Sequence, residues 1–303
     1  MKWTLWFLLV CGILISFALW LGWGRRAHWS TATGWSALSA EELAWEHFSE
    51  AVYEVTGERP KLNWLGHATM GINWNGRYLL TDPVSSGRVK VAPCLFDKPC
   101  LDETRPVDAV LITHAHMDHL DNPTLGRLFP TTIYLPSGSE RFLSKAVRRR
   151  HTVIPVQIGA PFAVGALEVV PVPAKHGGWR YPWQWWRNLF ACGYIVRAGA
   201  HVLYVAGDTA AGPHFQEIKE QYHPQYAVLP IGAYSPEWFL RKRHLNPEEA
   251  LDAANVLGAE FVVPYHFGTY RVSLEKVDEP LRRFAKEAIE RKQKWILPVD
   301  QRF

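Results

Sequence analysis

The stretch VLITHAHMDHLD, residues 110–121, places three histidines and two aspartates directly after an apolar run. Imidazole and carboxylate groups are good ligands for zinc, and one zinc ion needs only three or four of them. The stretch alone offers His114, His116, Asp118 and His119. Two metals about 3.5 to 4 Å apart can activate one water for attack on an electrophile. The cluster therefore predicts a metal centre with hydrolytic chemistry.

Three more candidate ligands stand at the ends of other apolar runs. They are His176 after VVPVPAK, Asp208 after VLYVAG and His266 after FVVPY. The chain has 13 histidines, and a lone histidine is more often structural than a ligand. An H-x-H-x-D-H string followed downstream by His, Asp and His is far more specific, and it favours a metal centre over scattered structural residues.

The candidate ligands are expected to lie at the ends of short strands. Alternating or apolar runs predict strands at DAVLITH, TTIYLP, TVIPVQI, LEVVPVPA, FACGYIVR, HVLYVAG, YAVLPI and EFVVPYH. Asn75-Gly76 lies between two alternating runs and predicts a β-hairpin, since both residues tolerate the positive φ of a type I′ turn. Several strands end in a charged or histidine-bearing turn, which indicates a site along one rim of the sheets.

Helices are predicted between the strands. Their expected ranges are 39–54, 137–149, 215–221, 246–257 and 274–291. Ser137 and Glu140 have capping-box spacing, and the run NPEE from Asn246 supplies an N-cap, a proline at N1 and an acid at N3. Gly258 is expected to end that helix. The alternation of strands and helices predicts one soluble α/β domain.

The N-terminus predicts a membrane anchor. Residues 3–23 carry no charge over a length that can cross a bilayer, which needs about 20 apolar residues. Signal-peptide cleavage is disfavoured, because Trp20, Leu21 and Trp23 stand where small residues are expected. Lipidation at Cys11 is disfavoured, because LLV precedes the cysteine where a small residue is expected. The expected organisation is an anchor over 1–26, a linker and helix over 27–60, and a catalytic domain over 61–303.

Two features of the sequence bear on the cellular compartment of the catalytic domain. Cys94 and Cys100 are close enough to bridge across a proline-containing loop, which would suit an oxidising compartment, although two unpaired thiols fit equally well. Lys2 before an apolar run resembles a signal anchor. We therefore expect a single-pass protein of a bacterial inner membrane, with the catalytic domain on the periplasmic side.

Composition limits the partners. A net charge of +4 is too small to indicate nucleic-acid binding without a concentrated patch. The one dense run, Arg148 to His151, is interpreted as a solvated helix end, with a phosphate-contacting patch as the alternative. No nucleic-acid partner is expected.

Taken together, these motifs resemble the metallo-β-lactamase-fold hydrolases, and among them N-acylphosphatidylethanolamine-hydrolysing phospholipase D and its bacterial relatives. The resemblance rests on WLGHAT, LTDPV, ITHAHMDHLD, PAKHGGWR, WQWWRN, AGDTA, IGAYSPEWF, HLNPEEAL and HFGTYRVSLEKVDEP, and it covers residues 62–284. It implies an αββα sandwich with two zinc ions bound by rim loops between the sheets.

The resemblance also implies ligand roles. The first metal would be bound by His114, His116 and His176, the second by Asp118, His119 and His266, with Asp208 bridging them. Asp118 would also serve in catalysis. The chain departs from the family at Ala115 and Met117, where Asn and Tyr are usual, and at Phe267 in place of Trp. The missing tyrosine hydroxyl removes a polar contact near the substrate.

Three further features have two interpretations each. His244 precedes the expected Asn246 cap by two residues, where a helix N-terminus favours an anion, so it either contacts phosphate and protonates a leaving group or is structural. His67, in LGHAT, is expected to shape a loop rather than to act in catalysis. The segment GWRYPWQWWRN, residues 178–188, is either a loop covering a sheet edge or a patch for the bilayer headgroup region.

These expectations predict a zinc-dependent phosphodiesterase of the phospholipase D type that acts on N-acylphosphatidylethanolamine-like lipids. The alternatives are a lactonase, a thioesterase or a nuclease of the same fold, and a non-catalytic membrane-tethered metal-binding scaffold. A nuclease would require a wider basic surface. A complete set of seven ligands argues against the scaffold, since a binding module does not need an open dinuclear site.

Overall fold

The computed structural model describes residues 59–95, 101–181, 183–184 and 189–298. The predicted anchor, the helix expected over 39–54 and Cys100 lie outside the described residues, so the expected anchor and cysteine pairing stay predictions. Within the described ranges, none of the helices combines the length and the apolar character that crossing a bilayer requires.

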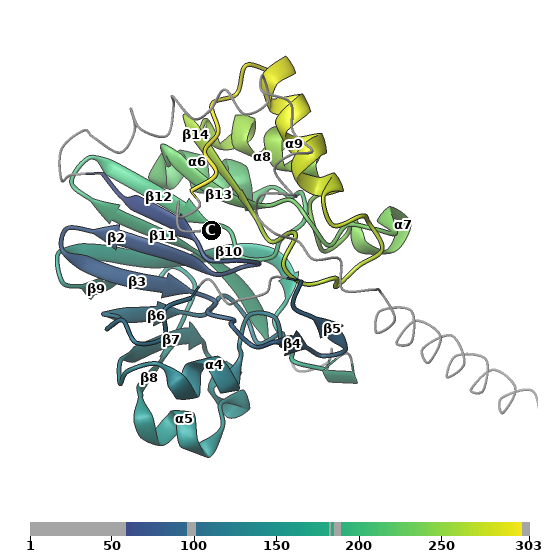
Figure 1. Ribbon diagram of the computed structural model, residues 1–303. Coiled ribbons are helices and arrows are strands. Elements are labelled where there is room, and N and C mark those ends of the chain that lie inside the picture. The colour runs from purple at the N-terminus through teal and green to yellow at the C-terminus, as the bar shows by residue number, and fades with distance from the viewer. Residues whose placement is uncertain (1–58, 96–100, 182, 185–188, 299–303) are drawn as a thin grey trace, which may run out of the picture.

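Two six-stranded sheets form the centre of the fold (Figure 1). The first sheet has the order β1-β2-β3-β6-β7-β8. Its strands are β1 (Lys61–Trp64), β2 (Met70–Trp74), β3 (Arg77–Thr81), β6 (Ala109–Leu111), β7 (Thr132–Pro136) and β8 (Thr152–Val156). The predicted hairpin joins β2 to β3, with φ of 48° at Asn75 and 70° at Gly76. That prediction is confirmed.

The second sheet has the order β14-β13-β12-β11-β10-β9. Its strands are β9 (Phe162–Val164), β10 (Leu167–Gly177), β11 (Phe190–Ala198), β12 (His201–Val205), β13 (Tyr226–Pro230) and β14 (Phe261–Tyr265). A small hairpin of β4 (Arg88–Val89) and β5 (Ala92–Pro93) lies apart from both sheets. Every predicted strand is present, whereas β1, β4, β5 and β9 were not predicted.

Helical segments surround the two sheets, and most of them cover the outer faces. They are α4 (Asn122–Arg127), the 3₁₀ turn η1 (Ser139–Phe142), α5 (Lys145–Arg150), α6 (His214–Tyr222), α7 (Glu237–Leu240), α8 (Pro247–Leu257) and α9 (Glu279–Glu290). In Figure 1, α4 and α5 lie beside β6 to β8, and α6, α8 and α9 lie on the far side of the second sheet. The arrangement confirms the predicted αββα sandwich.

Side-chain alternation explains why the first sheet has two packed faces. On β3, Leu79 joins the core shared with the second sheet, while Leu80 joins the cluster beneath α4 and α5. On β6, Leu111 and Val110 divide in the same way. In the second sheet β13 is buried at every position, as expected for a strand with parallel neighbours and both faces covered. The rim loops therefore stand on a rigid support.

Helix caps were predicted with mixed success. Asn246 forms the expected capping box with Glu249, and Gly258 closes α8 with a φ of 69°. The capping box at Ser137 is wrong: the Glu140 carboxylate accepts a hydrogen bond from the Gly138 N–H instead. The helix expected over 137–149 is interrupted, because the Ser144 side chain accepts from the Val147 N–H and starts α5 as a new helix.

The structure also tests two other helix predictions. The basic run after Lys145 occupies the last turn of α5, which confirms the helix-end interpretation. The helix expected over 274–291 begins only at Glu279. Residues before it form a loop, because the Glu275 carboxylate accepts hydrogen bonds from the backbone N–H groups of Ala233 and Ser235.

Candidate metal centre

All seven predicted ligands meet at one rim of the sandwich. His114, His116, Asp118 and His119 follow β6, His176 is the penultimate residue of β10, Asp208 follows β12, and His266 follows β14. Strands β12, β13 and β14 run parallel, so their carboxyl ends share one edge of the sheet. The loop after β6 meets that edge from the opposing sheet, and the ligands are gathered between the two.

The first group of potential ligands contains His114, His116, His176 and Asp208. The Nδ1 atom of His116 lies 2.9 Å from His114 Nε2 and 3.2 Å from His176 Nε2. Asp208 Oδ2 lies 3.9 Å from His114 Nε2 and 3.8 Å from His176 Nε2. Four ligand atoms therefore surround one small volume, as predicted for the first metal.

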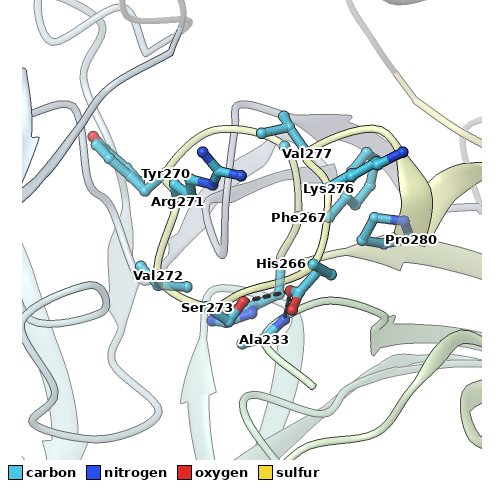
Figure 2. A pocket seen from close by; sticks show the side chains of 12 residues that line it. Ala233, His266, Phe267, Tyr270, Arg271, Val272, Ser273, Lys276, Val277 and Pro280 are labelled. Carbon is cyan, nitrogen blue, oxygen red and sulfur yellow. Dashed lines mark hydrogen bonds between the residues drawn. The ribbon is translucent and has the colours of Figure 1, made fainter. Parts of the chain in front are cut away.

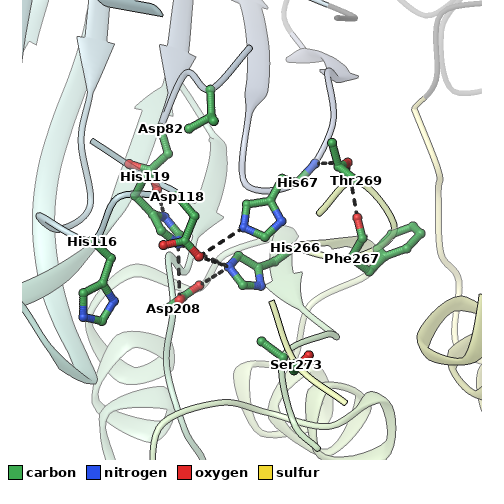
Figure 3. A network of polar contacts seen from close by, with 12 residues as sticks. His67, Asp82, His116, Asp118, His119, Asp208, His266, Phe267, Thr269 and Ser273 are labelled. Atoms are coloured by element: carbon green, nitrogen blue, oxygen red, sulfur yellow. Dashed lines mark hydrogen bonds and ion pairs between the residues drawn. The ribbon is translucent and has the colours of Figure 1, made fainter. Parts of the chain in front are cut away.

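The second group contains His67, Asp118, His119 and His266. His119 Nε2 lies 3.2 Å from His266 Nε2, and Asp118 Oδ2 lies 3.3 Å from His67 Nε2 and 4.0 Å from His266 Nε2. Figure 3 shows His67 directed towards Asp118 and His266. The three predicted ligands are thus joined by a fourth side chain that was expected only to shape a loop.

Asp208 lies between the two groups. Its Oδ1 atom is 3.0 Å from His266 Nε2, and its Oδ2 atom is 3.2 Å from His119 Nε2. His114 and His176 of the first group lie 3.9 and 3.8 Å from Oδ2 of the same carboxylate. Asp208 therefore faces histidines of both groups, which is the position that the family resemblance implies for a bridging ligand.

These atoms fit bound metal. Zinc holds nitrogen ligands at about 2.0–2.1 Å in a tetrahedron, which separates neighbouring ligand atoms by about 3.3 Å. The measured separations of 2.9 to 4.0 Å bracket that value. Asp118 Oδ1 is moreover buried and makes no hydrogen bond among the described residues. A buried carboxylate oxygen without a donor is suited to a cation.

Outer partners fix the orientation of two of the histidines. His119 Nδ1 lies 2.7 Å from Asp82 Oδ2, and His176 Nδ1 lies 2.8 Å from the carbonyl oxygen of Arg243. Each contact is satisfied when Nδ1 donates its proton, which leaves Nε2 free as a ligand. Asp82 is itself held by the Thr113 N–H and hydroxyl. Neither Asp82 nor Arg243 was predicted from the sequence.

Burial and neighbouring charges set the protonation of the site. Burial lowers the pKa of His114, His116 and His266 well below its usual value, so these rings are neutral as metal ligands must be. Burial also lowers the pKa of His119, but the Asp208 and Asp82 carboxylates outweigh this and raise it well above its usual value. The two carboxylates stabilise a positive charge beside His119, whether a proton or a bound metal ion carries it.

His67 and His266 occupy unusual backbone conformations, with φ of 48° and 60°. The His266 N–H donates to the His67 carbonyl at 2.8 Å, and the His67 N–H donates to Thr269 Oγ1 at 2.6 Å. Positive φ in non-glycine residues is costly and often marks functional sites. Both residues belong to the second group of potential ligands, and the contacts that hold their backbones arise between distant parts of the chain.

His244 also reaches the centre. Its Nδ1 atom lies 3.7 Å from Asp208 Oδ2, and its ring contacts that of His176 edge to face. Burial lowers its pKa to about 4, so the ring is neutral near pH 7. The structure therefore brings His244 beside the bridging carboxylate, and its part in catalysis remains a prediction.

The described parts of the tryptophan-rich segment have different surroundings, and its proposed contact with a bilayer stays a prediction. Arg180 donates from Nη1 to the carbonyl oxygens of Ala115 and Leu120, which braces the ligand loop. Trp179 packs edge to face on His116, with ring centroids 4.9 Å apart. Trp183, in contrast, is 63% exposed. The start of the segment is thus part of the metal centre's support, while Trp183 faces solvent.

Comparison with known proteins shows the family to which the chain belongs. Residues 77–267 match the family model described as the beta-lactamase superfamily domain. A metal-dependent hydrolase from Koribacter versatilis is 32% identical over 228 residues, which cover 72% of this chain and 89% of the relative. The chain belongs to the metallo-β-lactamase superfamily. At that level the expected activity is that of a metal-dependent hydrolase.

Other members of the superfamily align over shorter shares of their length. An uncharacterised protein of Mycobacterium tuberculosis is 32% identical over 78% of this chain, and the chain spans only 66% of that relative. An N-acyl-phosphatidylethanolamine-hydrolyzing phospholipase D of Caenorhabditis elegans is 28% identical over 68% of this chain and 63% of its own length. These matches bear on the superfamily rather than on a particular substrate.

Solved structures agree on the fold. The metallo hydrolase Igni18 from Ignicoccus hospitalis has a TM-score of 0.57 at 23% identity, covering 80% of this chain and 96% of its own. An isothiocyanate hydrolase from Delia radicum gut bacteria has a TM-score of 0.58 at 20% identity, with coverage of 79% and 96%. At this level of identity the likeness concerns the sandwich alone.

Proposed function

We propose that the protein is a dinuclear zinc hydrolase that cleaves phosphodiesters in the manner of a phospholipase D. The observation that carries the proposal is the pair of adjacent His and Asp groups with Asp208 between them. The mixture of imidazole and carboxylate ligands suits zinc. Zinc bound there would activate water and offset the negative charge of the non-bridging phosphate oxygens.

The protein's own residues have distinct parts in this reaction. The first and second groups would hold the ions, and Asp208 would offset the repulsion between them. Asp118 would serve as a ligand, and its Oδ1, which lacks a hydrogen-bond donor among the described residues, would face the ion or the water bound to it. His244, neutral and close to Asp208, donates a hydrogen bond to the leaving oxygen and passes it a proton taken up from solvent.

A lipid substrate is supported by features outside the metal centre. The helix α7 exposes Trp238 by 83% and Phe239 by 50%, and the basic run 241–243 follows directly. Aromatic and basic side chains suit the headgroup region of a bilayer. The expected anchor over residues 3–23 would hold the domain at such a surface, with the periplasmic side of a bacterial inner membrane as our proposal. We therefore propose lipids resembling N-acylphosphatidylethanolamine as substrates.

The decisive experiment is a comparison of substrate classes. The full chain, purified in detergent with zinc, should hydrolyse bis(p-nitrophenyl) phosphate and N-acylphosphatidylethanolamine in mixed micelles faster than a lactone or a thioester. Preference for either of the last two would replace the phosphodiesterase by another hydrolase. Failure to turn over any of them, with metal bound, would favour a metal-binding scaffold.

A further inference from the structure

The small hairpin of β4 and β5 presents a lysine at its turn. The two strands pair Val89 with Ala92, so the turn consists of Lys90 and Val91 alone. Lys90 has a φ of 52°, in the left-handed region that two-residue hairpins favour at this position. Arg88 donates from Nη1 to the Val91 carbonyl oxygen at 2.9 Å and braces the turn. Lys90 is exposed, while Val89 and Ala92 on either side of the turn are buried.

The hairpin packs against the loop that carries four of the ligands. Val89 and Ala92 belong to a small buried cluster with Tyr270, and Met117 packs against that cluster. Met117 directly precedes Asp118, a member of the second group. The apolar side of the hairpin therefore faces the ligand loop, and its turn lies beside the metal centre.

The loop that follows β14 holds the hairpin from another side. Figure 2 shows Tyr270 on this loop, close after His266. The Tyr270 hydroxyl donates to the Ser86 carbonyl oxygen at 2.5 Å, and Cys94, directly after β5, forms a β-bridge with Tyr270. The Tyr270 ring meets that of His67 edge to face, with centroids 5.4 Å apart. These contacts fix the hairpin against the second group of ligands.

Lys90 brings a positive charge to this side of the metal centre. Among the described residues, it makes no hydrogen bond and no ion pair. Burial raises the pKa of Asp118, but the Lys90 ammonium and the hydrogen bond with His67 outweigh burial and hold that pKa well below its usual value. The charge of Lys90 thus acts on the second group, although no side chain of the described residues neutralises it by direct contact.

A cation at this place favours an anion between itself and the metal centre. Zinc bound by the second group would engage the Asp118 carboxylate, which would then attract the ammonium less. Like charges repel each other, and an anion bound between them relieves the repulsion. A phosphodiester carries one negative charge, shared by its non-bridging oxygens. A lactone or a thioester carries no such charge at its reacting carbonyl group.

We propose that Lys90 is a specificity-determining residue whose ammonium binds a non-bridging phosphate oxygen and so favours anionic phosphodiesters over neutral esters. The inference deepens the proposed phosphodiesterase activity and rests on it. An ammonium group is a compact charge with three donors on a flexible stem, so it can reach an oxygen beside the metal centre while the hairpin stays fixed. Its contribution is to affinity, and we expect it in KM rather than in kcat.

Binding of two small phosphate esters to the zinc-loaded full chain, in a phosphate-free detergent, tests this role without turnover. Dimethyl phosphate is a phosphodiester anion, and trimethyl phosphate is its uncharged counterpart. In titrations at low salt followed by phosphorus NMR, Lys90→Asn should weaken binding of dimethyl phosphate about tenfold, since a charge-assisted hydrogen bond is lost. Binding of trimethyl phosphate should not change.

Two further variants serve as controls. Asn tolerates a positive φ, so Lys90→Asn removes the charge without straining the turn. Lys90→Arg keeps the charge and should retain most of the affinity. Lys145→Gln removes an exposed lysine at the start of α5, away from the metal centre, and should leave both affinities unchanged. With bis(p-nitrophenyl) phosphate as substrate, Lys90→Asn should raise KM by a factor similar to the loss of affinity while kcat stays close to that of the parent chain.

Three results would overturn the assignment. They are an unchanged affinity for dimethyl phosphate in Lys90→Asn, an equal loss for trimethyl phosphate, which would indicate altered packing, and an equal loss in Lys145→Gln, which would indicate non-specific attraction. Failure of the proposed function is a separate result. A chain that loses only the anion in Lys90→Asn, but hydrolyses a lactone and no phosphodiester, would refute the phosphodiesterase and leave Lys90 as an anion-binding residue.

Discussion

Asp208 places one carboxylate where two sets of imidazoles meet. Because Asp208 faces histidines of both groups, the substitution Asp208→Asn keeps the shape of the site but removes the charge that would offset repulsion between two cations. We expect a folded variant with about one zinc instead of two and turnover reduced by at least about 10². Metal analysis beside a phosphodiesterase assay checks this; two tightly held zinc ions with full turnover would exclude a bridging role.

His67 tests the part of the site that was not predicted. As a member of the second group it should contribute to metal affinity, so His67→Ala should lower the zinc content towards one ion while the first group stays occupied. His201→Ala, on β12 and outside both groups, serves as the matched control. Zinc titration against a chelating dye measures the effect. Equal affinities in the two variants would return His67 to a purely loop-shaping role.

His244 should act as a neutral ring. Burial lowers its pKa to about 4, so the ring stays uncharged at equilibrium as the pH falls from 8 to about 5.5. His244→Ala should therefore retain both metals and lower turnover by about 10², and by the same factor across that pH range. Parallel pH–rate profiles measure this. Full activity in the variant, or a ratio that changes around pH 6.5, would contradict the assignment.

At the scale of elements, α8 positions His244 through its capped start. Asn246 accepts from the Glu249 N–H at 2.8 Å, while the Glu249 carboxylate accepts from the Asn246 N–H. Asn246→Ala should lower the free energy of unfolding by about 1 kcal/mol, the usual value of an N-cap. Asn255→Ala, exposed within the same helix, should change it by less than about 0.5 kcal/mol. Urea denaturation compares the two, and equal losses would show that the cap is unimportant.

At the scale of the whole molecule, the predicted attachment to membranes involves residues outside those that the structure describes. The uncharged run over 3–23 predicts that the full chain sediments with membranes and resists extraction by carbonate or high salt. Fractionation of cells that express the chain measures this. Recovery of the full-length chain in the soluble fraction would remove the anchor and, with it, one support for a lipid substrate.

The sequence by itself predicted most of the strands and the α/β class, and it named seven candidate ligands, four of them in one short stretch. Those features are local: alternation along a strand, a turn residue pair, and ligand types that follow one strand within six residues. Tertiary structure alone decided which additional residues join them. His67 meets Asp118 across 51 positions, and His119 meets His266 across 147. Asp82 and the Arg243 carbonyl orient candidate ligands from other elements. Such contacts arise from the packing of the two sheets, and no short stretch of sequence encodes that packing.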